Sequence, residues 1–148
     1  MKKLIPIIFC LPFFLIHKIE IKMSNVIHVK GVSDYLATIK GEKRVIVVDF
    51  SASWCGPCKK LGFILDELSQ KYAQDILVLK IDIDEDGKLD EDEQLSSIVK
   101  VTSLPTICFV KDGQFQYGED YRIVGLKANQ LLWCLSTLTG KSFSIQDQ

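Results

Sequence analysis

The net charge of the sequence is small, and cysteine and histidine are scarce. The 148 residues contain 18 lysines and arginines against 19 acidic residues, which gives a formal charge of −1. Because residues 1–22 hold four lysines and one glutamate, the rest of the chain is slightly acidic, and we expect no nucleic-acid partner. Five cysteines, an odd and small number, argue against a scaffold held together by disulfides. A chain of this length can instead fold as one domain around its own hydrophobic core.

The scarcity of cysteine and histidine also limits what the one cysteine pair can do. Cys55 and Cys58 are separated by two residues, and a zinc site would need a second pair of ligands, so we expect no metal and no cofactor. A structural disulfide is the other alternative, although so small a ring adds little stability. The remaining cysteines and histidines stand singly: Cys10, Cys108, Cys134, His17 and His28. Cys108 and Cys134, in apolar segments, are expected to be inert core thiols.

The cysteine pair lies where a predicted strand meets a predicted helix. An apolar, β-branched run at 45–50 precedes the pair, and a helix-forming run at 61–72 follows it. A cysteine at the first turn of a helix faces unpaired backbone N–H groups, which favour its thiolate. Two such thiols, spaced to close a small ring, favour a redox-active dithiol.

Asp49 is an acidic residue within the predicted central strand at 44–52. Its neighbours Val48 and Phe50 are apolar, and burial among such residues raises the pKa of a carboxyl group. Six residues before Cys55, Asp49 is placed to accept a proton beneath the dithiol; the alternative is a strand-end residue that reaches solvent. Lys80, in the predicted third strand, either pairs with Asp49 across neighbouring strands or extends outward to solvent.

Apolar patterns along the rest of the chain predict alternating strands and helices. We expect Ser33 to cap the first helix, Asp112 and Gly113 to form a hairpin turn, and residues 140–148 to form a frayed tail. The third strand is expected to run parallel to the second, because a helix connects them. The predicted strands cover 26–30, 44–52, 76–83, 107–111 and 121–124, and the predicted helices cover 33–40, 61–72, 92–99 and 127–139.

The acidic segment 82–93 fits a second kind of site. It satisfies the D-x-D-x-D-G-x₅-E pattern of a calcium-binding loop, with ligands at Asp82, Asp84, Asp86 and Glu93. A helix is predicted after the segment but a strand before it, whereas an EF-hand has a helix on both sides. The two alternatives are a calcium-responsive binding module and a solvated acidic loop.

The first 22 residues have the features of a targeting segment. Lys2 and Lys3 are followed by thirteen uncharged residues, the n-region and h-region of a secretory signal. No A-x-A-like cleavage site follows, and Met23 stands directly before the first predicted strand. We therefore divide the chain into a signal-like extension at 1–22, a domain at 23–140 and a tail at 141–148. A domain that starts at Met23 favours the cytoplasm, whereas a used signal favours the secretory pathway or, if it stays uncleaved, a membrane anchor.

Four motifs, in order along the chain, resemble the thioredoxin family. They are V-V-D-F at 47–50, S-A-S-W-C-G-P-C-K at 51–59, L-P-T at 104–106 and D-G at 112–113, and the match spans about residues 24–140. The resemblance implies an α/β thioredoxin fold, with a central mixed sheet of about five strands flanked by about four helices. It also implies a thiol–disulfide oxidoreductase that reduces disulfide-bearing proteins and receives electrons from a thioredoxin-reductase-like donor. A secretory-pathway oxidoreductase is the alternative within the same chemistry.

The resemblance also implies roles for individual residues. Cys55 would be the exposed nucleophile, Cys58 the buried resolving thiol and Asp49 the proton acceptor, with Lys80 nearby. A cis peptide bond would precede Pro105. The glycine and proline between the cysteines look like those of the reducing members of the family. The substrate groove would be formed by Trp54, Gly56, Pro57, Leu104 and Pro105.

Three features depart from the family pattern. Phe63 stands where the family usually has a helix-kinking proline, the acidic segment around 86–92 is longer than usual, and so is the loop after Gly113. These departures bear on the choice of partner more than on the chemistry.

Overall fold

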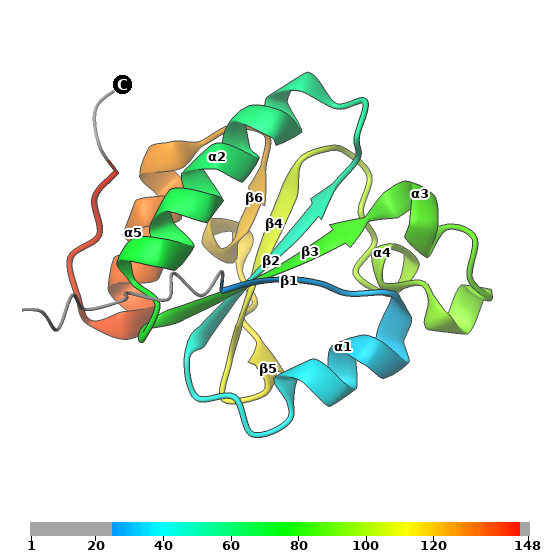
Figure 1. The fold of residues 1–148 in the computed structure, drawn as a ribbon, viewed down its shortest axis with the longest axis horizontal. Coiled ribbons are helices and arrows are strands. Elements are labelled where there is room, and N and C mark those ends of the chain that lie inside the picture. The colour runs from blue at the N-terminus through cyan, green and yellow to red at the C-terminus, as the bar shows by residue number, and fades with distance from the viewer. Residues whose placement is uncertain (1–24, 146–148) are drawn as a thin grey trace, which may run out of the picture.

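A mixed sheet forms the centre of the computed structural model, which describes residues 25–145 and so leaves the predicted extension at 1–22 outside the described residues. The strands are β1 (Val26–His28), β2 (Val45–Ser51), β3 (Ile76–Asp82), β4 (Thr106–Lys111), β5 (Gln114–Phe115) and β6 (Arg122–Val124). Within residues 25–145 these make a six-stranded sheet in the order β1-β3-β2-β4-β5, with β6 also paired to β4 (Figure 1). Strands β1, β3 and β2 are parallel, and β4 is antiparallel to β2, β5 and β6. The predicted mixed α/β architecture is confirmed.

Helices cover both faces of the sheet. Helices α2 (Gly56–Lys71) and α5 (Ala128–Thr139) lie on one face, and α1 (Gly31–Ile39) lies on the other (Figure 1). In the part of the chain that the structure describes, no helix is both long and apolar enough to cross a membrane. Short helical segments complete the chain: α3 (Ile83–Asp86), η1 (Glu91–Glu93) and α4 (Leu95–Ile98) between β3 and β4, and η2 (Glu119–Tyr121) before β6.

The central position of β2 follows from its continuous apolar sequence. Successive residues of a strand point to opposite faces of the sheet. Val47 accordingly packs in the cluster under α2 and α5, and Val48 packs with Tyr35 of α1 on the opposite face. A strand buried on both faces needs apolar residues at every position, so a polar residue within it requires a separate explanation.

Helix α1 begins two residues earlier than predicted. Lys30 is its N-cap residue, so Ser33 lies in the first turn and is not the cap. Ser33 instead donates hydrogen bonds from N and Oγ to the Glu93 carboxylate, at 3.1 and 3.0 Å. A carboxylate is favourable there because the first N–H groups of a helix have no partner within it. This partner lies 60 residues away in the sequence, so no local pattern reveals it.

Asp112 and Gly113 form the predicted hairpin turn, with positive φ values of 52° and 74°. The chain returns at once as β5, whereas the prediction placed the return only at 121–124. Strand β5 ends after two residues, and β6 then pairs with the other end of β4. The predicted strand exists as β6, and β5 was missed because two residues carry too short a pattern.

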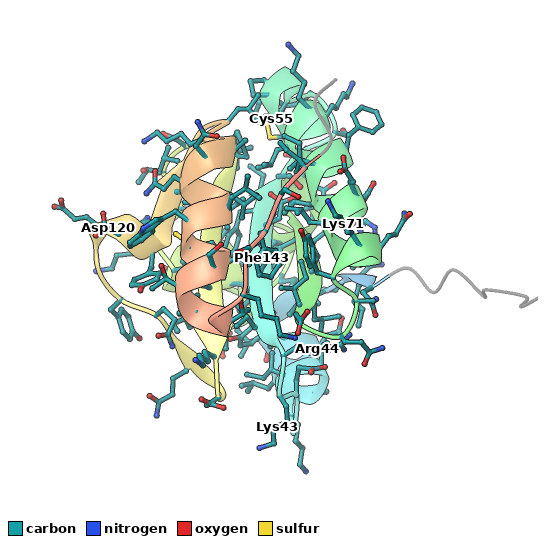
Figure 2. The ribbon with its side chains drawn as sticks, turned by 90° about the vertical axis from the view of Figure 1, so that its left-hand side faces the viewer. Lys43, Arg44, Cys55, Lys71, Asp120 and Phe143 are labelled. Carbon is teal, nitrogen blue, oxygen red and sulfur yellow. A yellow bond between two sulfur atoms is a disulfide. The ribbon has the colours of Figure 1, made fainter. Side chains whose placement is uncertain are left out.

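The frayed tail predicted for 140–148 is wrong for Phe143 and Ser144, which contact the C-terminal end of α2. Phe143 is buried (Figure 2). Its ring packs on that of Tyr72, with the two centroids 4.2 Å apart. Lys71 Nζ donates hydrogen bonds to the backbone oxygen and hydroxyl of Ser144, at 3.0 and 2.9 Å. Burial of one aromatic side chain stabilises a fold by about 2 kcal/mol, which is enough to hold a short segment.

Candidate active site

Cys55 and Cys58 form a disulfide at the start of α2, with an S–S distance of 2.07 Å and a Cα–Cα distance of 5.2 Å (Figure 2). Cys55 is the N-cap residue of the helix, and its sulfur accepts a hydrogen bond from Cys58 N at 3.3 Å. Pro57 occupies the first turn, where a missing N–H is tolerated. The strand-to-helix junction predicted from the sequence therefore carries a cysteine pair at disulfide distance.

A groove of about 580 Å³ opens beside the disulfide, and Cys55 lines it. Four of the five residues expected in the groove share this lining: Trp54, Gly56, Pro57 and Leu104. Pro105 is buried next to Leu104, and the peptide bond between them is cis, as expected. The sequence did not reveal the other lining residues, because they come from the chain between β3 and β4: Ile83, Ser96, Val101, Thr102 and Ser103.

A second cavity, of about 290 Å³, lies next to Cys58 and is also lined by Asp49. The two cysteines are equally buried, with exposed fractions of 6% for Cys55 and 5% for Cys58, so the expected exposure of Cys55 is not seen in the disulfide form. What distinguishes them is the space that each one lines. Cys55 borders the groove, and Cys58 borders the cavity that holds the carboxyl group.

Asp49 is 1% exposed, so the alternative of a strand-end residue that reaches solvent is wrong. Its Oδ1 atom has no hydrogen-bond partner among residues 25–145. Desolvation by burial raises the pKa of this carboxyl to about 6; the Lys80 charge opposes the rise and the Asp66 charge adds to it. A carboxyl group with such a pKa can take up and release a proton near neutral pH.

Lys80 takes neither of the two predicted arrangements. It is the neighbour of Asp49 across β2 and β3, but its Nζ forms an ion pair with Asp66 Oδ1 of α2 at 3.2 Å. The Lys80 side chain is only 18% exposed, so it does not extend into solvent either. The sequence could not identify this partner, because it depends on how α2 packs over the sheet.

The acidic segment 82–93 does not gather its carboxylates around one point. Asp82 Oδ1 accepts a hydrogen bond from Asp84 N at 2.9 Å, and Asp84 Oδ2 accepts one from Trp54 Nε1 at 2.8 Å. Glu93 is held by the first turn of α1, as described above. Among the described residues, no three acidic, histidine or cysteine side chains are grouped so that they could hold a metal ion.

Asp86, the remaining acidic residue of the calcium-loop pattern, is buried and 2% exposed. It accepts hydrogen bonds from Leu95 N, Ser96 N and Ser96 Oγ at 3.0, 2.8 and 2.5 Å. In place of the single helix predicted at 92–99, the chain forms η1 and then α4, and Asp86 binds the start of α4. Because Ser96 lines the groove, this carboxylate fixes part of the groove wall.

The two free cysteines of the described chain lie in the core, as predicted. Cys108 is 4% exposed and Cys134 is 0% exposed. Burial raises the pKa of the Cys108 thiol, and it raises the pKa of the Cys134 thiol to about 11. Both groups are therefore neutral thiols at physiological pH and poor nucleophiles.

Comparisons with known proteins agree with this geometry. The family model described as Thioredoxin matches residues 26–133. Thioredoxin-1 of Drosophila melanogaster is 32% identical over 105 residues, which cover 68% of this chain and 92% of that protein. Thioredoxin-T of the same species is 40% identical over 75 residues, which cover 51% of this chain and only 44% of that protein.

Solved structures give the same result. The thioredoxin of Fasciola hepatica aligns with a TM-score of 0.64 at 28% identity, over 76% of this chain and 98% of that one. The fold, the family match and the cysteine pair at disulfide distance all agree. This chain therefore belongs to the thioredoxin family and is a thiol–disulfide oxidoreductase.

Proposed function

We propose that the protein works as a reductase of protein disulfides in which Cys55 attacks and Cys58 resolves. The observation that carries this assignment is the division of space around the disulfide. Cys55 lines the groove, where a substrate segment can approach its sulfur, whereas Cys58 lines the cavity that contains the Asp49 carboxyl. Thioredoxins in general act on disulfide-bearing proteins and are reduced again by a reductase partner, and the same two kinds of partner are proposed here.

The reaction consists of two exchanges that together move two electrons. The Cys55 thiolate attacks one sulfur of the substrate disulfide; that disulfide breaks, and a mixed disulfide forms while the second substrate sulfur leaves as a thiolate. Cys58 then transfers its proton to the Asp49 carboxylate and attacks Cys55. The bond between Cys55 and the substrate breaks, the substrate sulfur that Cys55 had attacked leaves as the other thiolate, and the enzyme is left with the Cys55–Cys58 disulfide seen in the structure.

Apart from Cys55, the side chains around the groove position the substrate and contribute no reactive group. Trp54, which is 66% exposed, is fixed by its hydrogen bond to Asp84 and gives the groove an apolar wall. Leu104 lines the groove together with Cys55 and packs against the cysteine pair. We assign Trp54, Gly56, Pro57, Leu104 and Pro105 to substrate positioning.

The direction of electron flow is tested by the midpoint potential of the cysteine pair, measured by equilibration of the full chain with glutathione buffers. We expect a value more negative than about −240 mV. The glutathione pool of reducing compartments lies near this potential, and thioredoxins in general lie below it. A value more positive than about −200 mV, in the range of disulfide isomerases, would show that the protein is an oxidant or isomerase instead.

Replacement of Asp49 by asparagine is expected to slow resolution of the mixed disulfide roughly tenfold at pH 7, because Cys58 loses its proton acceptor. In the wild-type protein the rate should fall as pH drops through about 6, where the Asp49 carboxyl becomes protonated. The defect of the Asp49→Asn variant should shrink above about pH 8.5, where a thiol ionises unaided. Rapid-mixing kinetics across pH give the measurement, with Asp92→Asn, an exposed carboxylate, as the control. An unchanged rate and pH profile in Asp49→Asn would remove Asp49 from the mechanism.

A further inference from the structure

The cavity behind the disulfide contains more charged groups than proton transfer from Cys58 requires. Asp49 enters it from β2 and Cys58 from the start of α2. The other titratable groups that face it come from three elements: His28 of β1, Lys80 and Asp82 of β3, and Lys59 and Asp66 of α2. One of these charges, Lys80, is the cross-strand neighbour of Asp49.

The register of the sheet brings Lys80 within reach of Asp49. Residues paired across neighbouring strands point to the same face, and the strands are about 4.8 Å apart. A lysine side chain could therefore place its ammonium on the Asp49 carboxylate. It does not do so: Asp49 Oδ1 has no partner in the described chain, and Lys80 Nζ lies 3.2 Å from Asp66 Oδ1.

Helix α2 leaves room for the ion pair between Lys80 and Asp66. Gly62 and Asp66 are four residues apart and so lie on the same face of α2. A Cβ atom at Gly62 would lie 3.5 Å from Lys80 Nζ, so the ammonium rests against the helix at the position that lacks a side chain. The Asp66 side chain is partly exposed, at 46%, and holds Lys80 from α2.

We propose that Asp66 is a positioning residue that competes with Asp49 for Lys80 and so keeps the Asp49 carboxylate available as a proton acceptor. The proposal rests on the function proposed above for Asp49. If Lys80 moved onto Asp49, an opposite charge at contact distance would stabilise the carboxylate and weaken its affinity for a proton. Cys58 would then face a poorer base.

The electrostatic signs agree with this arrangement. After desolvation, which has the largest effect, the Lys80 charge lowers the pKa of Asp49 and the Asp66 charge raises it. Removal of the Asp66 charge and release of Lys80 therefore act in the same direction, towards a lower pKa of Asp49. Removal of Lys80 acts in the opposite direction.

The test is a titration of the Asp49 carboxyl by ¹³C NMR in the disulfide form of the full chain, in which Cys55 and Cys58 do not titrate. We expect Asp66→Asn to lower the midpoint by at least about one pH unit, because an ammonium at contact distance has an effect of this size. Asp66→Glu keeps the charge, so its Asp49 midpoint should stay close to that of the wild-type protein. Lys80→Met should raise the Asp49 midpoint, and Asp92→Asn should leave it unchanged.

A double-mutant cycle separates positioning from the direct effect of the Asp66 charge. In the Lys80→Met background, Asp66→Asn should lower the midpoint by less than half as much as it does when Lys80 is present. An equal shift in both backgrounds would overturn the proposal, since Asp66 would then act by its charge alone. The kinetics of Asp49→Asn test the underlying function separately: if that variant resolves mixed disulfides normally, the role of Asp49 fails, whatever the titration shows.

Discussion

Serine in place of Cys55 is expected to lower the turnover of insulin disulfides on the order of 10³-fold or more, as the loss of a nucleophile typically does. A serine hydroxyl does not ionise near neutral pH and cannot replace a thiolate as the attacking group. Among the described residues, Cys108 and Cys134 are buried thiols with raised pKa values, and Cys58 lines the cavity beside Asp49 and not the groove, so none of the three is placed to replace Cys55. The measurement is the rate of insulin reduction with dithiothreitol as electron donor.

Serine in place of Cys58 should stop turnover at a different step. Cys55 can still attack, but the mixed disulfide is not resolved, so each protein molecule reacts once and remains attached to its substrate. Cys134→Ala serves as the control, because it removes a thiol from the core while the groove and the disulfide stay intact. Turnover retained by both serine variants would contradict the dithiol mechanism.

Replacement of Asp86 by alanine is expected to lower the free energy of unfolding by about 3 kcal/mol. The carboxylate is 2% exposed, and its removal leaves the N–H groups of Leu95 and Ser96 without their acceptors. A loss of this size is a large fraction of the stability of a typical domain. Urea denaturation monitored by circular dichroism gives the measurement.

The matched variants make the Asp86 result specific. Asp86→Asn keeps one acceptor oxygen and should lose about half as much stability as Asp86→Ala, whereas Asp92→Asn, an exposed carboxylate of the same segment, should change it by less than about 0.5 kcal/mol. If Asp86→Ala were as stable as the wild-type protein, the buried carboxylate would not hold α4 in place. Calcium ions should stabilise none of these proteins if the segment acts through its local hydrogen bonds.

The parts of the site that could be predicted from the sequence depend on short stretches of chain. The apolar run of β2, the cysteine spacing and the helix after Cys58 are neighbours in sequence, so strand, turn and helix signals agree there. The burial of Asp49 could also be predicted from its own strand, because a strand that is apolar on both faces must lie inside the sheet.

The parts that could not be predicted depend on contacts between distant segments. The Lys80 ion pair requires α2 to lie over β3, and the Glu93 carboxylate reaches α1 across 60 residues. The acidic pattern at 82–93 resembled a calcium loop because its spacing was right. Spacing alone does not reveal that Asp86 turns inward to bind α4.

The roles proposed for the two cysteines also depend on the structure, since neither spacing nor burial separates the two residues. The separation comes from the groove beside Cys55 and the carboxyl-lined cavity beside Cys58, which are built from β2, α2 and the chain between β3 and β4. A resemblance to a family can suggest which cysteine attacks, and these two spaces give that suggestion a physical reason.

The identity of the attacking cysteine is tested most directly by mass spectrometry of the two serine variants after each is mixed with a disulfide-bearing protein under non-reducing conditions. We expect Cys58→Ser to form a one-to-one covalent adduct through Cys55, and Cys55→Ser to form little or none. An adduct that forms with Cys55→Ser and not with Cys58→Ser would place the nucleophile at Cys58 and contradict the proposed mechanism.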